Sequence, residues 1–386
     1  MIELCSSEKC TGCGACYNAC PKHCITMVPE GVEGFLYPVI NTEHCVECGL
    51  CRKSCPILTP SSPKCEPIVY AAWNLDDGIR QTSSSGGMFY SLAEAVIRTG
   101  GVVYGVVMSG DGTVQHQRAE SVQELTPMKG SKYVQSDTRK SYSKALVDLR
   151  QGRKVMFTGT PCQVAAFRSF LNKRSYDNLL LVDIVCHGVP SNKLFKDYLE
   201  KLEKEKGCSV CKSSFTFREF NAWGYAPSVK LTDGTRQRIP PQDDVYMRHF
   251  LASYISRDSC YNCMFSTTPR HSDITIADFW GIGSESHFEG EPKKGCSLVL
   301  INSETGKDAF DAIKSHLFYE KRILSEAKNV NHQLYRPSER PKQRNGAYGY
   351  FFSHSIAGIY SHYYNTPYHK LRHLVGKILR AINVIK

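Results

Sequence analysis

A cysteine motif occurs twice within the first 60 residues, and this repeat constrains the fold more than any other feature of the chain. Its spacing, C-x2-C-x2-C-x3-C-P, is the same in both copies. The first copy begins at Cys10 and the second at Cys45, 35 positions later. Soft thiolates with this spacing are the ligands of [4Fe–4S] cubanes. The repeat therefore predicts two iron–sulfur clusters in a small α+β module.

The fourth cysteine of each copy cannot close on the cluster that its own first three cysteines wrap, so each cluster draws on both copies. The predicted ligands of cluster I are Cys10, Cys13, Cys16 and Cys55. The predicted ligands of cluster II are Cys45, Cys48, Cys51 and Cys20. The alternatives are zinc sites and disulfides, but zinc modules use C-x2-C pairs on longer arms rather than triplets closed by Cys-Pro. The segment resembles bacterial two-cluster ferredoxins over its whole length, which implies a relay of single electrons.

Charge and composition restrict the class of protein further. The chain has 386 residues, 18 cysteines and a formal charge of +11, and its lysines and arginines are spread along the sequence. We expect no nucleic-acid partner, because no helix-turn-helix or zinc-finger spacing accompanies the charge. The N-terminus lacks the basic and apolar regions of a signal peptide, so we expect a cytoplasmic location, where cysteines serve as ligands or redox groups.

The texture of the sequence changes after a Pro- and Ser-rich linker at 59–63. Strand-like apolar runs then alternate with helical periodicity, as in Ile68–Trp73 followed by Gly87–Arg98. This alternation predicts a larger α/β domain with a mixed or partly parallel sheet. We expect three regions, namely a dicluster domain at 1–60, the α/β domain at 61–335, and a C-terminal segment at 336–386.

Four cysteines of the large domain form a second constellation. Cys162 and Cys186 each follow a predicted buried strand, while Cys260 and Cys263 form a C-x2-C pair. Parallel neighbouring strands would bring the first two cysteines to the same rim of the sheet, where such folds carry their sites. These four cysteines are candidates for a third cluster, whereas Cys208 and Cys211 are a rival pair that we expect to be ordinary thiols.

Three short segments are candidates for binding a phosphorylated ligand. Glycines, hydroxyls and backbone N–H groups at a helix N-terminus suit a pyrophosphate, and lysines with a nearby aromatic ring suit phosphate and a stacked ring. A helix cap and a solvated basic loop are the ordinary alternatives for the first two segments. The candidate residues are Ser84, Ser85, Gly86 and Gly87; Lys129, Gly130, Ser131, Lys132 and Tyr133; and Thr158 and Gly159. No G-x-G-x-x-G fingerprint supports a nicotinamide site.

Several blocks in a fixed order resemble the coenzyme F420 hydrogenase/dehydrogenase beta-subunit family. They are SSSGGMF (83–89), GGVVYGVV (100–107), KGSKYVQSD (129–137), FTGTPCQVAAF (157–167), VDIVCHGVPS (182–191), CYNC (260–263) and SDITIADFWGI (272–282). The resemblance implies FAD, a third [4Fe–4S] cluster on the four cysteines of the large domain, and an organic substrate. That substrate would be F420 or another two-electron acceptor.

Side chains near these blocks are candidates for contact with the reactants. His187 is a candidate proton donor or a partner of cluster sulfur, with a structural histidine as the alternative. Arg218 and the pair Trp223-Gly224 stand in a further block that looks family-like, and they are candidates for substrate contact.

The C-terminus combines an aromatic stretch, 348–364, with a basic amphipathic pattern over 370–386. The aromatic stretch either lines a groove or packs structurally. A basic amphipathic helix can lie on an anionic membrane surface, and docking on the protein itself or on a partner is the alternative.

The sequence as a whole predicts an oxidoreductase that passes electrons from a ferredoxin or partner redox subunit, through three [4Fe–4S] clusters and FAD, to a small-molecule substrate. Flavin can join one-electron clusters to a two-electron step. The alternative is a non-catalytic electron-transfer subunit of a larger complex.

Overall fold

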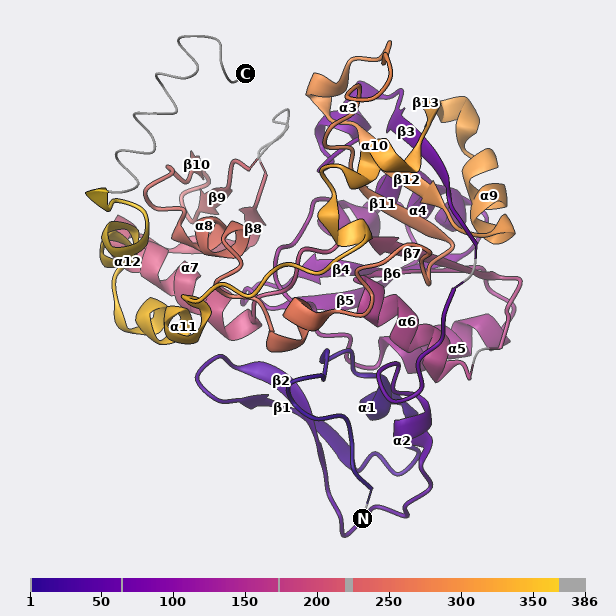
Figure 1. Ribbon diagram of the computed structural model, residues 1–386, viewed down its shortest axis with the longest axis horizontal. Coiled ribbons are helices and arrows are strands. Elements are labelled where there is room, and N and C mark those ends of the chain that lie inside the picture. Colours follow the sequence, from indigo (N-terminus) through magenta and orange to yellow (C-terminus); the bar gives the residue numbers. More distant parts are fainter. Residues whose placement is uncertain (1, 64, 173, 219–224, 368–386) are drawn as a thin grey trace.

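The computed structural model describes residues 2–63, 65–172, 174–218 and 225–367. The predicted C-terminal amphipathic helix and the pair Trp223-Gly224, a candidate for substrate contact, lie outside these residues. The chain begins with a small module, at the bottom of Figure 1, that consists of α1 (Ala15–Ala19), β1 (Ile25–Glu30), β2 (Phe35–Ile40) and α2 (Leu50–Lys53). Its two strands pair antiparallel, with Ile25 opposite Ile40.

The large domain is built on an eight-stranded sheet with the order β13-β3-β12-β11-β7-β6-β4-β5. Its central strands β11, β7, β6 and β4 run parallel, and the outer strands pair antiparallel. The strands are β3 (Ile68–Asn74), β4 (Val102–Met108), β5 (Val114–Ala119), β6 (Val155–Gly159), β7 (Leu179–Ile184), β11 (Ile274–Asp278), β12 (Ser297–Ile301) and β13 (Leu317–Arg322). The predicted α+β module followed by an α/β domain with a mixed sheet is thereby confirmed.

Helices cover both faces of this sheet. Alternate residues of each strand point to opposite faces, and apolar residues on both faces are buried by packing against helices. In β7, Leu180 and Val182 pack with side chains of α4 and α9, whereas Leu179 and Leu181 pack with those of α5 and α6. The helices around the sheet are α3 (Asp77–Gln81), α4 (Met88–Arg98), α5 (Ser141–Arg150), α6 (Pro161–Phe170), α9 (Glu304–Asp311) and α10 (Leu324–Lys328). Short 3-10 turns lie at Gln123–Met128, Asp258–Asn262, Pro292–Lys294, Lys314–His316 and His332–Leu334.

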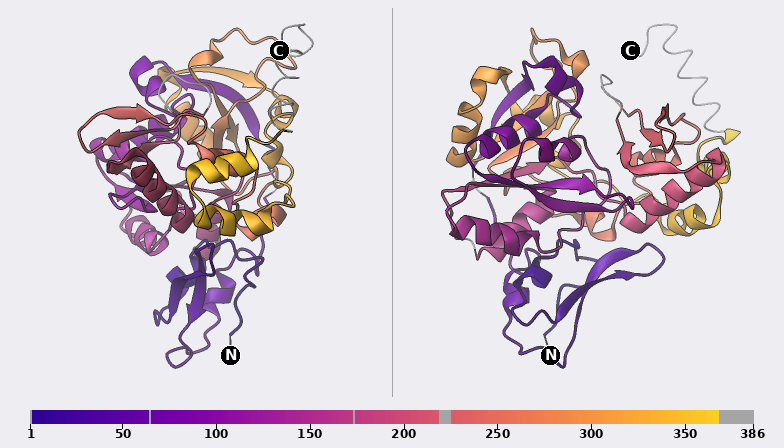
Figure 2. Two further views of the ribbon diagram at one scale, coloured as in Figure 1. Left: turned by 90° about the vertical axis from the view of Figure 1, so that its left-hand side faces the viewer. Right: turned by 180° about the vertical axis from the view of Figure 1, so that it is seen from behind.

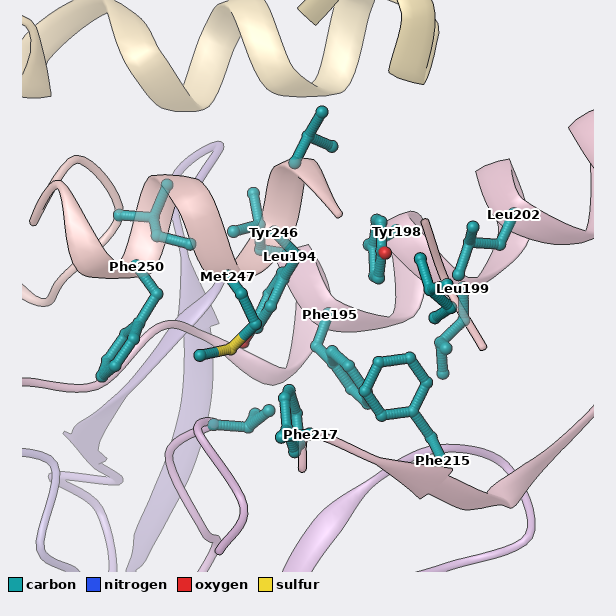
Figure 3. Packing of buried hydrophobic residues seen from close by; sticks show 14 of the residues in the cluster. Leu194, Phe195, Tyr198, Leu199, Leu202, Phe215, Phe217, Tyr246, Met247 and Phe250 are labelled. Carbon is teal, nitrogen blue, oxygen red and sulfur yellow. The ribbon is translucent and has the colours of Figure 1, made fainter. Parts of the chain in front are cut away.

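A separate lobe packs beside the sheet, on the left of Figure 1. It contains α7 (Asn192–Lys206), β8 (Val210–Thr216), β9 (Ser228–Leu231), β10 (Arg236–Arg238), α8 (Val245–Leu251), α11 (Arg344–Ser353) and α12 (Ile356–Tyr363). Figure 3 shows its core, in which Phe195 of α7 and Tyr246 of α8 meet Phe217 just after β8. Tyr348 and Phe351 belong to the same core. This part of the aromatic C-terminal stretch therefore packs structurally.

The N-terminal module docks against α5 and α6 through α1, and both views of Figure 2 place it at one end of the molecule. At its hairpin, the Glu33 carboxylate accepts two hydrogen bonds from Arg344 of α11, at 2.5 and 2.7 Å. Arg344 is buried, so this ion pair fixes the hairpin to the lobe. Over the described residues, no helix has the length and apolar character required to span a membrane.

Candidate functional site

Two hollows in the N-terminal module gather the repeated cysteines. Cys10, Cys13, Cys16 and Cys55 line one hollow, and Cys20, Cys45, Cys48 and Cys51 line the other. Each hollow takes three cysteines from one copy of the motif and the last cysteine from the other copy. This exchange follows from the fold, because α1 and α2 lead the fourth cysteine of each copy away from its own loop.

Glycines in the left-handed conformation start both short helices. Gly14 (φ 74°) precedes α1, and Gly49 (φ 70°) precedes α2. At Gly14 a Cβ atom would lie 2.4 Å from the Thr138 hydroxyl oxygen, so only glycine lets this loop approach the large domain so closely. The loops that carry the first three cysteines are thus preformed by backbone geometry.

Sequence reasoning missed a fifth cysteine in each hollow. Cys5 lines the first hollow and Cys24 lines the second, where its sulfur lies 3.3 Å from that of Cys20. Among the described residues, no three His, Cys, Asp or Glu side chains converge closely enough to hold a single metal ion. A cubane differs from a single-ion site, because its four thiolates bind four separate irons. The donor set, which is soft sulfur alone, fits the same group.

The four cysteines of the large domain come together at the carboxyl ends of neighbouring parallel strands. Cys162 follows β6 in the first turn of α6, and Cys186 follows β7. Burial, with smaller contributions from the thiolates of Cys263 and Cys260, raises the pKa of Cys162 to about 12. Burial likewise raises the pKa of Cys186 to about 12, with Cys162 and Cys263 adding to the rise. The four sulfurs therefore lie close enough together to form one site, and its donors fit a further cubane.

The rival pair lies elsewhere. Cys211 is an exposed residue of β8, and Cys208 packs against the core of the lobe. Neither is among the causes of the raised pKa values of Cys162, Cys186 and Cys260.

A cavity opens at the carboxyl ends of the parallel strands and unites the three predicted segments. Its walls include Ser84, Ser85 and Gly87; Lys129, Gly130, Ser131, Lys132 and Tyr133; and Thr158, Gly159 and His187. The segments meet directly, because the Ser84 hydroxyl accepts a hydrogen bond from the Ser131 backbone N–H at 2.6 Å. This position agrees with the rule that open α/β sheets carry their ligands at the carboxyl ends of parallel strands.

Gly86 is the exception among the predicted residues, since it does not line the cavity. Its N–H donates to the Ser297 hydroxyl at 2.9 Å, and a Cβ atom there would lie 2.3 Å from the carbonyl oxygen of Ala72. Its role is therefore the close approach of this loop to β3 and β12.

Two lysines bring positive charge to one part of the cavity. The Lys132 ammonium donates to the carbonyl oxygens of Pro127 (2.8 Å) and Lys129 (2.7 Å). Burial lowers the pKa of Lys132 to about 7. Lys129 donates to the Thr82 hydroxyl at 3.1 Å and lies over the ring of Tyr90. These cations suit a ligand with an anionic group.

An ion pair contributes to a further wall of the cavity. The Arg218 guanidinium binds both carboxylate oxygens of Asp278, at 3.0 and 2.8 Å, and lies near the rings of Tyr225 and Trp280. Burial raises the pKa of Asp278, and Arg218 opposes that rise. Sequence reasoning singled out Arg218 but missed Asp278, Tyr225 and Trp280. The only available signal was that Asp278 ends a strand within a block that resembles the family.

The cavity reaches the four-cysteine site. Thr160 and His187 line the cavity; Thr160 stands two residues before Cys162, and His187 directly follows Cys186. The Thr160 hydroxyl oxygen lies 3.1 Å from the Cys162 sulfur. Burial lowers the pKa of His187, which favours the neutral imidazole.

The four-cysteine site also reaches the N-terminal module. The Tyr142 hydroxyl lies 2.9 Å from the carbonyl oxygen of Cys13 and 3.1 Å from that of Gln163, the residue after Cys162. Cys162 in turn raises the pKa of Cys13, after burial and Cys10 and Cys55. The two hollows, the four-cysteine site and the cavity thus follow one another through the molecule.

Comparisons with known proteins identify both parts of the chain. Residues 9–57 match a 4Fe-4S dicluster domain, and residues 152–326 match the family described as the C terminus of the coenzyme F420 hydrogenase/dehydrogenase beta subunit. No curated protein sequence is significantly similar to this chain. Solved structures that are similar to it include the xenon-derivatized F420-reducing [NiFe] hydrogenase complex from Methanosarcina barkeri. That match has 17% identity and a TM-score of 0.46, and it covers 70% of this chain and 88% of that one.

The dicluster match confirms the predicted [4Fe–4S] clusters of the N-terminal module, and the second match confirms the family resemblance. The chain therefore contains a 4Fe-4S dicluster domain at residues 9–57 and, at residues 152–326, a region of the family described as the C terminus of the coenzyme F420 hydrogenase/dehydrogenase beta subunit.

Proposed function

We propose that this iron–sulfur protein is a flavin-dependent oxidoreductase with a third [4Fe–4S] cluster on Cys162, Cys186, Cys260 and Cys263. The observation that carries the proposal is the order of the sites in the molecule, in which the four-cysteine site separates the dicluster module from a ligand cavity. The proximity of the four sulfurs, seen in the pKa shifts of Cys162, Cys186 and Cys260, supports a shared metal group. Their partial burial supports a relay position, because it limits the access of solvent and of other oxidants to a cluster held there.

The cavity would hold FAD. Its serine hydroxyls and the ammonium groups of Lys129 and Lys132 fit the diphosphate, because they supply hydrogen-bond donors and positive charge. Apolar walls from Val106, Val182 and Ile276 fit a flat ring system. FAD would supply the exchange between single electrons and an electron pair.

The chain's own residues would bind and orient the reactants. Thr160 lies between the cavity and Cys162, and its hydroxyl, which reaches the side-chain oxygen of Gln163 at 3.1 Å, could turn its single hydrogen to a ligated sulfur at the same distance. His187 is half-buried on the cavity wall, and its neutral imidazole can hold or donate a proton at a ring nitrogen. Arg218, held by Asp278, presents a fixed positive charge for an anionic substrate.

The substrate would be a small organic two-electron carrier, and F420 is the specific candidate that the family description suggests. The electron donor would be a ferredoxin or a partner redox subunit that meets the dicluster module. In this scheme residues 1–60 form the electron-entry domain, 61–335 the flavin and cluster domain, and 336–386 a C-terminal segment.

A second function has its own support, because the matched family is described as a beta subunit. In that case the chain would relay electrons within a complex, and another subunit would supply the active site. Turnover by the isolated chain separates the two functions.

The decisive experiment uses the anaerobically purified, reconstituted chain and measures bound flavin and its reduction. We expect one FAD per chain that ferredoxin reduces through the clusters. The double change Cys10→Ser with Cys45→Ser should slow that reduction, while direct chemical reduction of the flavin should persist. Reoxidation of the reduced chain by an added organic acceptor supports the enzyme. A flavin that is reduced but reoxidised only by a partner subunit supports the relay, and a chain that binds no flavin after reconstitution contradicts the proposal.

A further inference from the structure

Arg257 joins the dicluster module to the four-cysteine site and is fully buried, with 0% of its surface exposed. Its guanidinium donates to the carbonyl oxygen of Cys10 at 2.7 Å, to the side-chain oxygen of Gln135 at 3.1 Å and to the carbonyl oxygen of Leu36 at 3.1 Å. It also lies 4.1 Å from the ring centre of Tyr37. One side chain thus binds both the first cysteine loop and the hairpin of the module.

The backbone of Arg257, in contrast, bonds to the segments that carry the four-cysteine site. Its carbonyl accepts a hydrogen bond from the Cys260 N–H at 2.9 Å, and its N–H donates to Val189, three residues after Cys186. At Gly12, between Cys10 and Cys13, a Cβ atom would lie 2.7 Å from a terminal nitrogen of the Arg257 side chain. The guanidinium therefore packs directly on the cluster I loop.

The charge of Arg257 has no carboxylate partner among the described residues, since each of its side-chain hydrogen bonds ends on a neutral oxygen. An unpaired charge in the interior carries a large desolvation cost. Cysteine sulfurs lie near this cation, because Arg257 opposes the burial-driven rise in the pKa of both Cys162 and Cys260; the Asp258 and Glu33 carboxylates are also in its neighbourhood but make no ion pair with it. Sulfur-bound clusters are the natural counter-charge for this cation.

We infer that Arg257 is a positioning residue for electron transfer, which holds the cluster I loop against the four-cysteine site and makes both adjacent clusters easier to reduce than cluster II. The inference rests on the proposed function for the third cluster. In the step concerned, one electron leaves cluster II, passes to cluster I and then to the third cluster. No bond forms or breaks and no proton moves. A reduced cluster carries one more negative charge than the oxidised form, so a buried cation favours the electron on its own side of the module.

Tyr142 provides a matched control, because it bridges the same two parts without charge. Its buried hydroxyl lies between the carbonyl oxygens of Cys13 and Gln163. Tyr142→Phe removes a link across the junction but leaves the electrostatic environment of the clusters nearly unchanged.

The test is an anaerobic potentiometric titration with dithionite, followed by electron paramagnetic resonance, on the full reconstituted chain. We expect Arg257→Gln to shift the one-electron equilibria of cluster I and the third cluster at least about tenfold toward the oxidised form, a fall of about 59 mV. Cluster II should change much less. Arg257→Lys keeps the charge and should restore most of the potential, and Tyr142→Phe should match the wild type.

Unchanged potentials in an iron-replete Arg257→Gln chain would overturn the inference, as would equal shifts in Arg257→Gln and Tyr142→Phe. If Arg257→Gln does not retain iron, the Arg257→Lys chain provides the test. This variant keeps the positive charge, so a fall in its cluster potentials as large as that expected for loss of the charge would contradict an electrostatic role. Absence of a third cluster in the wild-type chain would refute the proposed function instead. The potential of cluster I would still test Arg257 in that case.

Discussion

The hydroxyl oxygen of Thr160 lies 3.1 Å from the sulfur of Cys162. Thr160 also lines the cavity and caps α6, where it contacts the side-chain oxygen of Gln163 at 3.1 Å. One side chain therefore touches the ligand cavity and a cysteine of the proposed third cluster. Because hydrogen bonds to cluster sulfur raise reduction potentials by stabilising the added negative charge, this contact makes a direct prediction.

Thr160→Val should lower the reduction potential of the third cluster. Loss of a hydrogen bond worth about 1 kcal/mol corresponds to roughly 40 mV for one electron. The same change removes a helix cap and should lower the free energy of unfolding by about 1 kcal/mol. Thr160→Ser keeps the hydroxyl and should preserve both values. Equal potentials in the Val and Ser variants, measured by redox titration, would show that the hydroxyl does not act on the cluster.

Lys132 should make flavin affinity depend on pH. In the free chain its pKa is about 7, and a bound anionic phosphate would raise that pKa by stabilising the charged ammonium. Affinity should therefore be highest below pH 7 and fall as pH rises, by up to about tenfold per unit, until the pKa of the complex is reached. Flavin fluorescence titrations between pH 6 and about 9 measure this slope.

Two variants separate Lys132 from its neighbour. Lys132→Met should bind flavin weakly at low pH with the slope largely abolished, while Lys129→Met should bind weakly and keep the slope. The flavin-free wild-type chain adds an independent check. Because the unfolded chain keeps the lysine proton up to 10.5, this group makes the free energy of unfolding rise with pH between about 7 and 10.5. A slope that survives in Lys132→Met would assign the titration to another group.

The Glu33–Arg344 ion pair should hold the hairpin of the dicluster module in place. Glu33→Gln leaves the buried guanidinium of Arg344 with the Asp258 carboxylate, at 3.7 Å, as its remaining counter-charge. Breaking a buried pair costs about 3–5 kcal/mol, and partial exposure of Glu33 reduces the expected loss to about 1–3 kcal/mol. Denaturant unfolding measures this loss of stability. In Glu33→Gln the rate of amide hydrogen exchange should rise first in the hairpin. Glu30→Gln, an exposed change on the same hairpin, should have little effect, and equal losses in both variants would contradict a specific clamp.

Local patterns in the sequence were sufficient to predict most of the fold. Apolar runs such as those at 102–108 and 179–186 became strands β4 and β7, because buried strands need continuous apolar sequence. The cysteine spacing predicted which residues share each hollow. The first three cysteines of each motif are three residues apart, so the loop that carries them places their thiolates around one hollow. The strand ends also predicted that Cys162 and Cys186 would meet, because β6 and β7 are parallel neighbours.

Contacts between distant segments could not be predicted in this way. Arg257 and Cys10 are 247 positions apart, and Glu33 and Arg344 are 311 apart, so no local pattern marks either contact. Gly86 was expected at the cavity because it stands among serines that line it. Its actual role is the close approach of the loop to Ala72 of β3. That contact depends on how β3 packs against the loop, and nothing in the loop sequence itself indicates it.

The iron and acid-labile sulfide content of paired cysteine variants tests the central claim most directly. The anaerobically reconstituted wild-type chain should contain about 12 iron atoms, from three cubanes. Cys260→Ser should lower this content by about 4, whereas Cys208→Ser, a change in the other C-x2-C pair, should leave it unchanged. A wild-type content that stays near about 8 after full reconstitution, or iron lost in Cys208→Ser but not in Cys260→Ser, would contradict a third cluster between the dicluster module and the cavity.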